Sequence, residues 1–263
     1  MKNTYEARFS RNIGVFTEVE QRKIRDAAIA IAGTGGVGGL LAERLARLGT
    51  GKLKLSDSGT FESSNLNRQF GASQSTLGGH KSEVVCQSIE DINPEMLITC
   101  DNRGIHTQED ADRLVEDCQL IIDEMDYGAW KESIFLQRAA RKKGIHYLFA
   151  GAIGFGALVT NFDPAGITLE EYNGLEPGID LETLQVGSVS QERILPMMPT
   201  YAGDAMSMEM IQEIITGQRP VPTCSIGVGL ASLMAAQEAV NTILRRRQLI
   251  TAPDYIYVDL MDR

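Results

Sequence analysis

The sequence predicts an α/β fold, a Rossmann-like, doubly wound and mostly parallel sheet with a C-terminal lobe or crossover segment. Short apolar runs alternate with amphipathic segments between residues 27 and 147, which is typical of βαβ units. A glycine-rich turn joins the first apolar run to the first helical pattern. The composition is that of a globular protein, because 43% of the 263 residues are hydrophobic and 23% are charged.

The first half of the chain is expected to form repeated strand–helix units. Glycines follow two of the helical patterns at Gly49 and Gly144, where they end a helix without steric cost. Residues 58–79 lack a regular period, and loops of this length are usually functional or disordered. We expect strands at 27–32, 52–57, 96–100, 120–123 and 145–150, and helices at 40–48, 80–92, 108–117 and 130–143.

The second half of the chain differs from the first in composition and in hydrophobic period. Residues 163–200 are rich in glycine, proline and acidic residues and show no period, so they predict a lobe or crossover loop. We expect a nucleotide-binding domain with an N-terminal helix at 1–162. Residues 163–263 would add a substrate-shaping segment, a long buried helix and a terminal strand that complete the same domain. The expected elements here are strands at 154–162 and 255–259 and helices at 204–215 and 225–247.

Charge and cysteine usage narrow the class of protein. The net charge of −10 argues against nucleic acid as the main partner, since phosphate backbones require a basic face. The N-terminus lacks the apolar core of a signal peptide, and no apolar stretch is long enough to span a bilayer.

None of the four cysteines forms a C-x-x-C pair, so we expect reduced thiols in a cytoplasmic protein. Cys86, Cys100 and Cys118 are expected to be structural.

The glycine-rich turn predicts a nucleotide site. It fits G-x-G-x-x-G, follows a strand and opens a helix, whose N-terminal N–H groups attract phosphates. Asp57 ends the next strand, where a carboxylate binds ribose hydroxyls. The alternative is a turn that merely packs well. The glycines of this turn are Gly33, Gly35, Gly36 and Gly38.

The loop at residues 58–79, called the polar loop below, suits a triphosphate when taken together with Lys81 just after it. Asn65, Arg68, Gln69 and Lys81 would bring an amide, a guanidinium and an ammonium to one pocket, and a triphosphate carries too much charge for one helix dipole to balance. The alternative is a solvated loop with scattered charges.

Two acids flank the end of a predicted strand at Asp123 and Asp126. Ligands bind at the carboxyl ends of parallel strands, and a carboxylate there suits Mg²⁺ that bridges phosphates. The alternative is that Asp126 caps the following helix.

These pieces, taken in order, resemble the ThiF/MoeB/HesA family of the ubiquitin-activating superfamily. The resemblance covers about residues 8–163 and returns at 223–244. It implies a homodimeric Rossmann-like enzyme that binds Mg-ATP and adenylates the C-terminal glycine of a ubiquitin-like or sulfur-carrier protein. The motifs that carry it are Arg8-Phe9-Ser10-Arg11-Asn12, the glycine turn, Asp57, Ser64-Asn65-Leu66-Asn67-Arg68-Gln69, Gly79-His80-Lys81, Ile92-Asn93-Pro94 and the Asp123/Asp126 pair.

The resemblance also implies a role for single residues. Asp57 would bind the ribose, Asp126 would bind Mg²⁺, and Arg11 would reach into the partner subunit's site as an arginine finger. The phosphates would be held by Asn65, Arg68 and Lys81. The nucleophile is already anionic at neutral pH, so no general base is required.

The chain departs from the family pattern in three places. It lacks the two C-x-x-C pairs that bind a structural zinc in many relatives, so we expect a zinc-free variant. Tyr127 stands where an asparagine often follows the metal-binding aspartate. Residues 163–201 match nothing recognisable where relatives shape the acyl-substrate site. A carrier-protein tail and a small carboxylic acid therefore both stay open as substrates.

Cys224 is a candidate nucleophile. It precedes the long helix at 225–247, and a helix N-terminus stabilises a thiolate. Relatives use a cysteine in a comparable Thr-Cys segment to receive the activated carrier or its sulfur. The alternative is an inert buried cysteine.

The sequence leaves several functions in play. An ATP-dependent adenylyltransferase for a carrier protein is the first, and the same chemistry on a small carboxylic acid in cofactor biosynthesis is the second. A nicotinamide-dependent oxidoreductase shares only the glycine turn and Asp57. A non-catalytic scaffold is disfavoured because Arg11, Arg68, Lys81 and Asp126 are all present.

Overall fold

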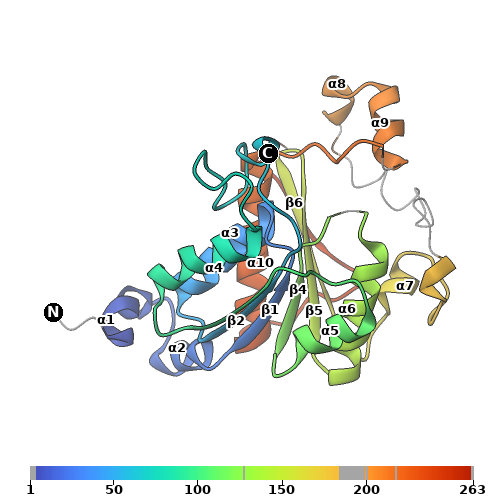
Figure 1. Cartoon of the computed structure of the whole chain (residues 1–263). Helices are drawn as coiled ribbons and strands as arrows, with labels where there is room; N and C mark the ends of the chain where they lie inside the picture. Colours follow the sequence, from blue (N-terminus) through green and yellow to red (C-terminus); the bar gives the residue numbers. More distant parts are fainter. Residues whose placement is uncertain (1–3, 127, 184–198, 200, 217, 262–263) are drawn as a thin grey trace.

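The computed structural model describes residues 4–126, 128–183, 199, 201–216 and 218–261, within which seven strands form one sheet (Figure 1). The strand order is β3-β2-β1-β4-β5-β6-β7. Neighbouring strands from β3 to β5 pair in parallel, whereas β6 pairs antiparallel with β5 and with β7. The expected α/β class is confirmed. The strands are β1 (Ala28–Ala32), β2 (Lys52–Ser56), β3 (Leu97–Asp101), β4 (Leu120–Asp123), β5 (His146–Ile153), β6 (Gly156–Phe162) and β7 (Ile256–Asp259).

Helices cover both faces of the sheet (Figure 1). Side chains of α3, α4 and α10 form one hydrophobic core, and those of α5, α6 and α7 form the other. The central strands are buried on both sides, which explains the uninterrupted apolar run of β1. The helices are α1 (Tyr5–Phe9), η1 (Ser10–Asn12), α2 (Glu18–Arg25), α3 (Gly36–Leu48), η2 (Ser63–Asn65), α4 (Lys81–Ile92), α5 (Gln108–Val115), α6 (Trp130–Lys143), α7 (Leu169–Tyr172), η3 (Leu181–Thr183), α8 (Ala202–Ala205), α9 (Met208–Ile215) and α10 (Ser225–Leu244).

Several helix boundaries differ from those expected, and the largest differences are in three places. The helix after the glycine turn begins at Gly36, because the glycines form its first turn. The helix predicted at 204–215 is two short helices, and Ser207 caps the second by accepting the Met210 N–H. The long helix ends at Leu244 because Arg245 adopts a left-handed conformation with φ of 56°. No helix among the described residues is both long and apolar enough to cross a membrane.

One cysteine prediction is wrong. Cys86 of α4 and Cys100 of β3 form a disulfide, so these two are not free thiols. They lie 14 residues apart in the sequence, and α4 packs directly against β3, which brings their Cα atoms to 6.4 Å. Cys118 and Cys224 are free. Tyr127 and most of the 184–200 part of the unmatched segment lie outside the described residues.

Candidate functional site

The sheet has a topological switch point beside β1. Its neighbours are β2 on one side and β4 on the other, and all three strands run in the same direction. Ligands of open α/β sheets bind at the carboxyl ends of strands at such a point. The glycine turn, Asp57 and the 124–126 loop follow these three strands, so the fold places them at one edge.

The glycine turn is packed so closely that side chains are excluded. Gly33 has φ of +87°, and a Cβ at this position would lie 2.3 Å from the Glu124 carbonyl oxygen. A Cβ at Gly38 would lie 1.9 Å from the Gly33 carbonyl oxygen. Gly35 precedes α3 and offers no side-chain cap, so the first N–H groups of α3 are available to an anion.

Asp57 is fixed to this turn. Its Oδ2 accepts hydrogen bonds from the main-chain N–H of Thr34 at 2.6 Å and from the Thr34 hydroxyl at 3.1 Å. Its Oδ1 accepts a bond from the Gly59 N–H at 2.7 Å. The carboxylate that the sequence assigns to ribose is therefore oriented by donors from two loops.

The polar loop brings Arg68 to the turn. The Arg68 Cγ lies 3.7 Å from the position that a Cβ of Gly36 would occupy. Its guanidinium donates to the Ser64 carbonyl at 3.1 Å and to the Asn67 side-chain oxygen at 2.8 Å. Asn65 is buried, and its Oδ1 accepts the Glu62 N–H at 2.9 Å, which gives it a structural task within η2.

Lys81 lies beside Asp57 and Gly59. It opens α4, and its N–H donates to the Gly59 carbonyl at 3.0 Å. The Cβ position of Gly59 lies 3.3 Å from the Lys81 Nζ and 3.1 Å from the Asp57 Oδ1. Within the described part of the chain, neither Lys81 nor Arg68 forms an ion pair with a carboxylate. Within this part of the chain, the charge of neither cation is therefore balanced by a carboxylate, although the Arg68 guanidinium already donates two hydrogen bonds.

The two acids after β4 differ in environment. Asp123 is buried, accepts the Met125 N–H at 3.0 Å and accepts the Tyr147 hydroxyl, and burial raises the pKa of its carboxyl. Asp126 is exposed. It does not cap α6, because the cap residue is Ala129 and makes no side-chain cap bond. The alternative role considered for Asp126 is therefore wrong. No group of three metal-binding side chains occurs among the residues described.

Glu124 is a site residue that sequence reasoning missed. Its Cβ lies 3.2 Å from the Cβ position of Gly38, and its Oε1 is covered without a hydrogen-bond partner among the described residues. Burial raises the pKa of this carboxyl well above its usual range, and the neighbouring Asp123 adds to the effect. The only sequence signal was its place between two candidate acids.

Cys224 is brought to the same edge. It is the residue before α10, and its Sγ lies 3.7 Å from the Gly154 carbonyl oxygen. One turn later, Val228 lies 3.2 Å from the Cβ position of Gly36. The Asn67 amide donates to the Thr223 carbonyl at 3.1 Å, which ties this end of α10 to the polar loop.

Arg11 does not join the site of its own chain. It is exposed on η1, and the next residue, Asn12, donates to the Leu48 carbonyl at 3.2 Å. Leu48 ends α3, whereas the glycine turn begins this helix. The two features therefore lie at opposite ends of α3.

A glycine turn at a switch point, a fixed acid and two cations that have no carboxylate partner among the described residues define a nucleotide-binding α/β protein. The chain belongs to the ThiF family, whose model matches residues 9–263. This confirms the family expected from the motifs.

Sequence relatives are matched over part of their length. The chain is 31% identical over 152 residues to the tRNA threonylcarbamoyladenosine dehydratase of Haemophilus influenzae, which is 58% of each protein. It is 38% identical over 96 residues to the ubiquitin-like modifier-activating enzyme 5 of Drosophila mojavensis, covering 36% of this chain and 24% of that protein. The match thus spans little more than half the length of the first relative and a quarter of the second.

Solved structures share the fold over the whole chain. The crystal structure of E. coli MccB with ATP superposes with a TM-score of 0.73 at 18% identity, covering 100% of this chain and 69% of that one. PaaA gives a TM-score of 0.71 at 19% identity, covering 100% of this chain and 72% of that one.

Proposed function

We propose that the chain is an ATP-dependent adenylyltransferase that converts a carboxylate into an acyl-adenylate and releases pyrophosphate. The observation that carries the proposal is that Arg68 lies beside the glycine turn and Lys81 beside the Asp57 that binds this turn. Among the described residues, neither cation is paired to a carboxylate. An unpaired guanidinium and ammonium beside a helix N-terminus form a site for a multiply charged phosphate. Membership of the ThiF family supports this assignment.

The chemistry follows from the charges at this edge. The substrate carboxylate attacks the α-phosphorus, the bond to the bridging oxygen breaks, and pyrophosphate leaves. Arg68 and Lys81 would neutralise charge on the leaving group, the Asn65 amide would help to orient it, and Asp57 would hold the ribose. The exposed Asp126 carboxylate fits Mg²⁺, which binds through one or two carboxylates together with phosphate oxygens. When bound, the ion would neutralise phosphate charge.

The proposed substrate is the C-terminus of a ubiquitin-like or sulfur-carrier protein. The likeness to a ubiquitin-like modifier-activating enzyme supports it. Cys224 would then attack the acyl-adenylate carbonyl to form a thioester and release AMP. Its place at the start of α10, one turn from the Gly36 contact, supports this role.

A carboxylic acid other than a carrier tail is the second candidate. The likeness to tRNA threonylcarbamoyladenosine dehydratases from two bacteria, at 31% and 32% identity, favours the acid group of a modified nucleoside. If this acid is presented on tRNA, a nucleic acid would be a partner despite the net charge of −10.

Carboxylate-dependent exchange of labelled pyrophosphate into ATP tests the proposal. We expect exchange with a matching carboxylate, and a loss of about 10²-fold or more in Lys81→Met and Arg68→Ala, because each removes charge that stabilises the transition state. Lys142→Ala is the matched control, since Lys142 forms an ion pair with Asp112 at the surface. Exchange supported by a small acid but by no carrier protein would select the second candidate. ATP binding without exchange for any carboxylate would contradict adenylation.

A further inference from the structure

The disulfide lies in a ring of contacts that encloses the main chain of Asp57. The Asp57 N–H donates to the Asp101 carbonyl at 3.0 Å, and Asp101 follows Cys100 directly. On the other side, the Ser82 hydroxyl donates to the Asp57 carbonyl at 3.3 Å, and Ser82 lies one helical turn before Cys86. The Cys86–Cys100 bond joins these two arms. One covalent bond and two hydrogen bonds therefore hold Asp57 from both sides.

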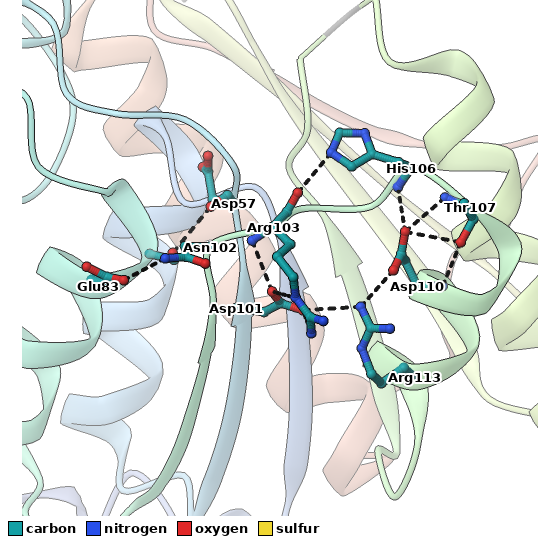
Figure 2. A network of polar contacts seen from close by, with 10 residues as sticks. Asp57, Glu83, Asp101, Asn102, Arg103, His106, Thr107, Asp110 and Arg113 are labelled. Carbon is teal, nitrogen blue, oxygen red and sulfur yellow. Dashed lines mark hydrogen bonds and ion pairs between the residues drawn. The ribbon is translucent and has the colours of Figure 1, made fainter.

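Both arms of the ring are themselves fixed. Ser82 is fully buried, and its neighbour Glu83 accepts a bond from the Asn102 amide at 2.7 Å (Figure 2). The Asp101 carboxylate accepts bonds from Arg103 at 2.9 and 3.0 Å. These contacts tie the start of α4 to the end of the edge strand β3, at the level where Asp57 leaves β2. A change at the disulfide is therefore transmitted to the backbone of Asp57 rather than absorbed by a loose loop.

The ring connects directly to the proposed nucleotide site, on which this inference rests. The Asp57 carboxylate binds Thr34 of the glycine turn. Lys81, at the start of the same helix as Cys86, donates its N–H to Gly59, two residues beyond Asp57. The residues proposed to contact the ribose and the phosphates thus lie on, or hydrogen-bond to, the segment that the disulfide holds in place.

We propose that Cys86 and Cys100 are a redox-modification site, and that the oxidised pair favours nucleotide binding by bracing Asp57. Cys86 is buried, whereas Cys100 lies exposed on the edge strand and is open to attack. A thiolate of an external dithiol attacks the Cys100 sulfur, the protein S–S bond breaks, and Cys86 leaves as a thiolate that takes up a proton. The second thiol of the reductant then displaces Cys100. The reductant becomes a disulfide, and the protein gains two electrons and two protons.

Thiol alkylation and nucleotide titration of the wild-type chain, before and after dithiothreitol, test the proposal. Alkylation in denaturant, followed by peptide mapping, should find only Cys118 and Cys224 modified under non-reducing conditions, and all four cysteines after reduction, since buried Cys118 is accessible only in the unfolded chain. We expect reduction to raise the Kd for ATP by at least about fivefold, the lower end of ordinary coupling between sites. The Cys86→Ala/Cys100→Ala variant keeps the other two thiols. It should bind ATP with the Kd of the reduced protein, and dithiothreitol should not change this Kd.

Hydrogen exchange gives a second reading that needs no nucleotide. Reduction should speed exchange at the Asp57 and Gly59 amides while leaving those of α6 unchanged, because local opening exposes only the braced segment. Equal exchange and equal Kd in the two redox states would overturn the proposal, as would free Cys86 and Cys100 under non-reducing conditions. Faster exchange without ATP binding in either state would support the brace and overturn the nucleotide site instead.

Discussion

At the scale of single residues, the structure gives each predicted polar group a specific surrounding. Arg68 lies beside the glycine turn and Lys81 lies beside Asp57, and within the described ranges neither is paired to a carboxylate, as the triphosphate hypothesis requires. The Asn65 Oδ1 accepts a hydrogen bond from the Glu62 N–H, so this residue has a structural role as well. Glu124 is the unexpected member, because its Cβ is packed against the helix that begins at the turn.

Glu124→Gln should change how stability depends on pH. The folded-state pKa of Glu124 is raised, so its stability contribution is present below the unfolded pKa and is lost as pH rises towards the folded pKa. Glutamine does not titrate. The free energy of unfolding of the variant, relative to wild type, should therefore increase with pH above about 4.3, by up to about 1.4 kcal/mol per pH unit. Urea unfolding at several pH values from 4 to 8 measures this difference, and a difference independent of pH would contradict it.

At the scale of elements, two helices meet where the site forms. The N-terminal turns of α3 and α10 touch through Gly36 and Val228. The glycine turn is thus enclosed between α10, the 124–126 loop and the polar loop. Glycines in these elements serve different purposes, since Gly38 avoids a collision with the main chain whereas Gly229 in α10 has open space around it.

Alanine substitutions at these two glycines should have opposite effects. Gly38→Ala places a Cβ 1.9 Å from the Gly33 carbonyl oxygen, so the turn must shift, and we expect a loss of more than about 2 kcal/mol in stability. Gly229→Ala meets nothing within 4 Å inside a helix, so it should stabilise the chain by about 0.5–1 kcal/mol. Chemical denaturation of both variants provides the comparison. Equal destabilisation would show that the close approach at Gly38 is not what selects glycine.

At the scale of the whole molecule, the predicted role of Arg11 at the nucleotide site cannot be fulfilled within a single chain. It lies exposed beyond the far end of α3 from the glycine turn. An arginine finger at this place can act only on a second copy. The homodimer and the role of Arg11 both stay predictions.

Mixing two inactive variants tests this arrangement. Arg11→Ala lacks the finger, and Lys81→Met lacks a phosphate contact in its own site. In a mixed dimer, the Lys81→Met chain supplies Arg11 to the intact site of its partner. Random exchange of subunits should therefore restore about one quarter of wild-type pyrophosphate exchange, since half of the dimers are mixed and each has one complete site. If Arg11 acts within its own chain, the mixture will stay inactive.

The sequence by itself determined the order of strands and helices, the glycine turn and the identity of Asp57, Arg68 and Lys81 as candidate ligands. These features follow from local period, turn chemistry and the rule that ligands bind at the carboxyl ends of parallel strands. Only the tertiary structure decided that Cys86 meets Cys100, that the Glu124 Oε1 is covered, that Asp126 does not cap α6, and that the start of α10 packs on Gly36. Each of these depends on the distance between segments that belong to different elements. Such distances are set by how whole helices and strands pack, and no local pattern of residues carries that information.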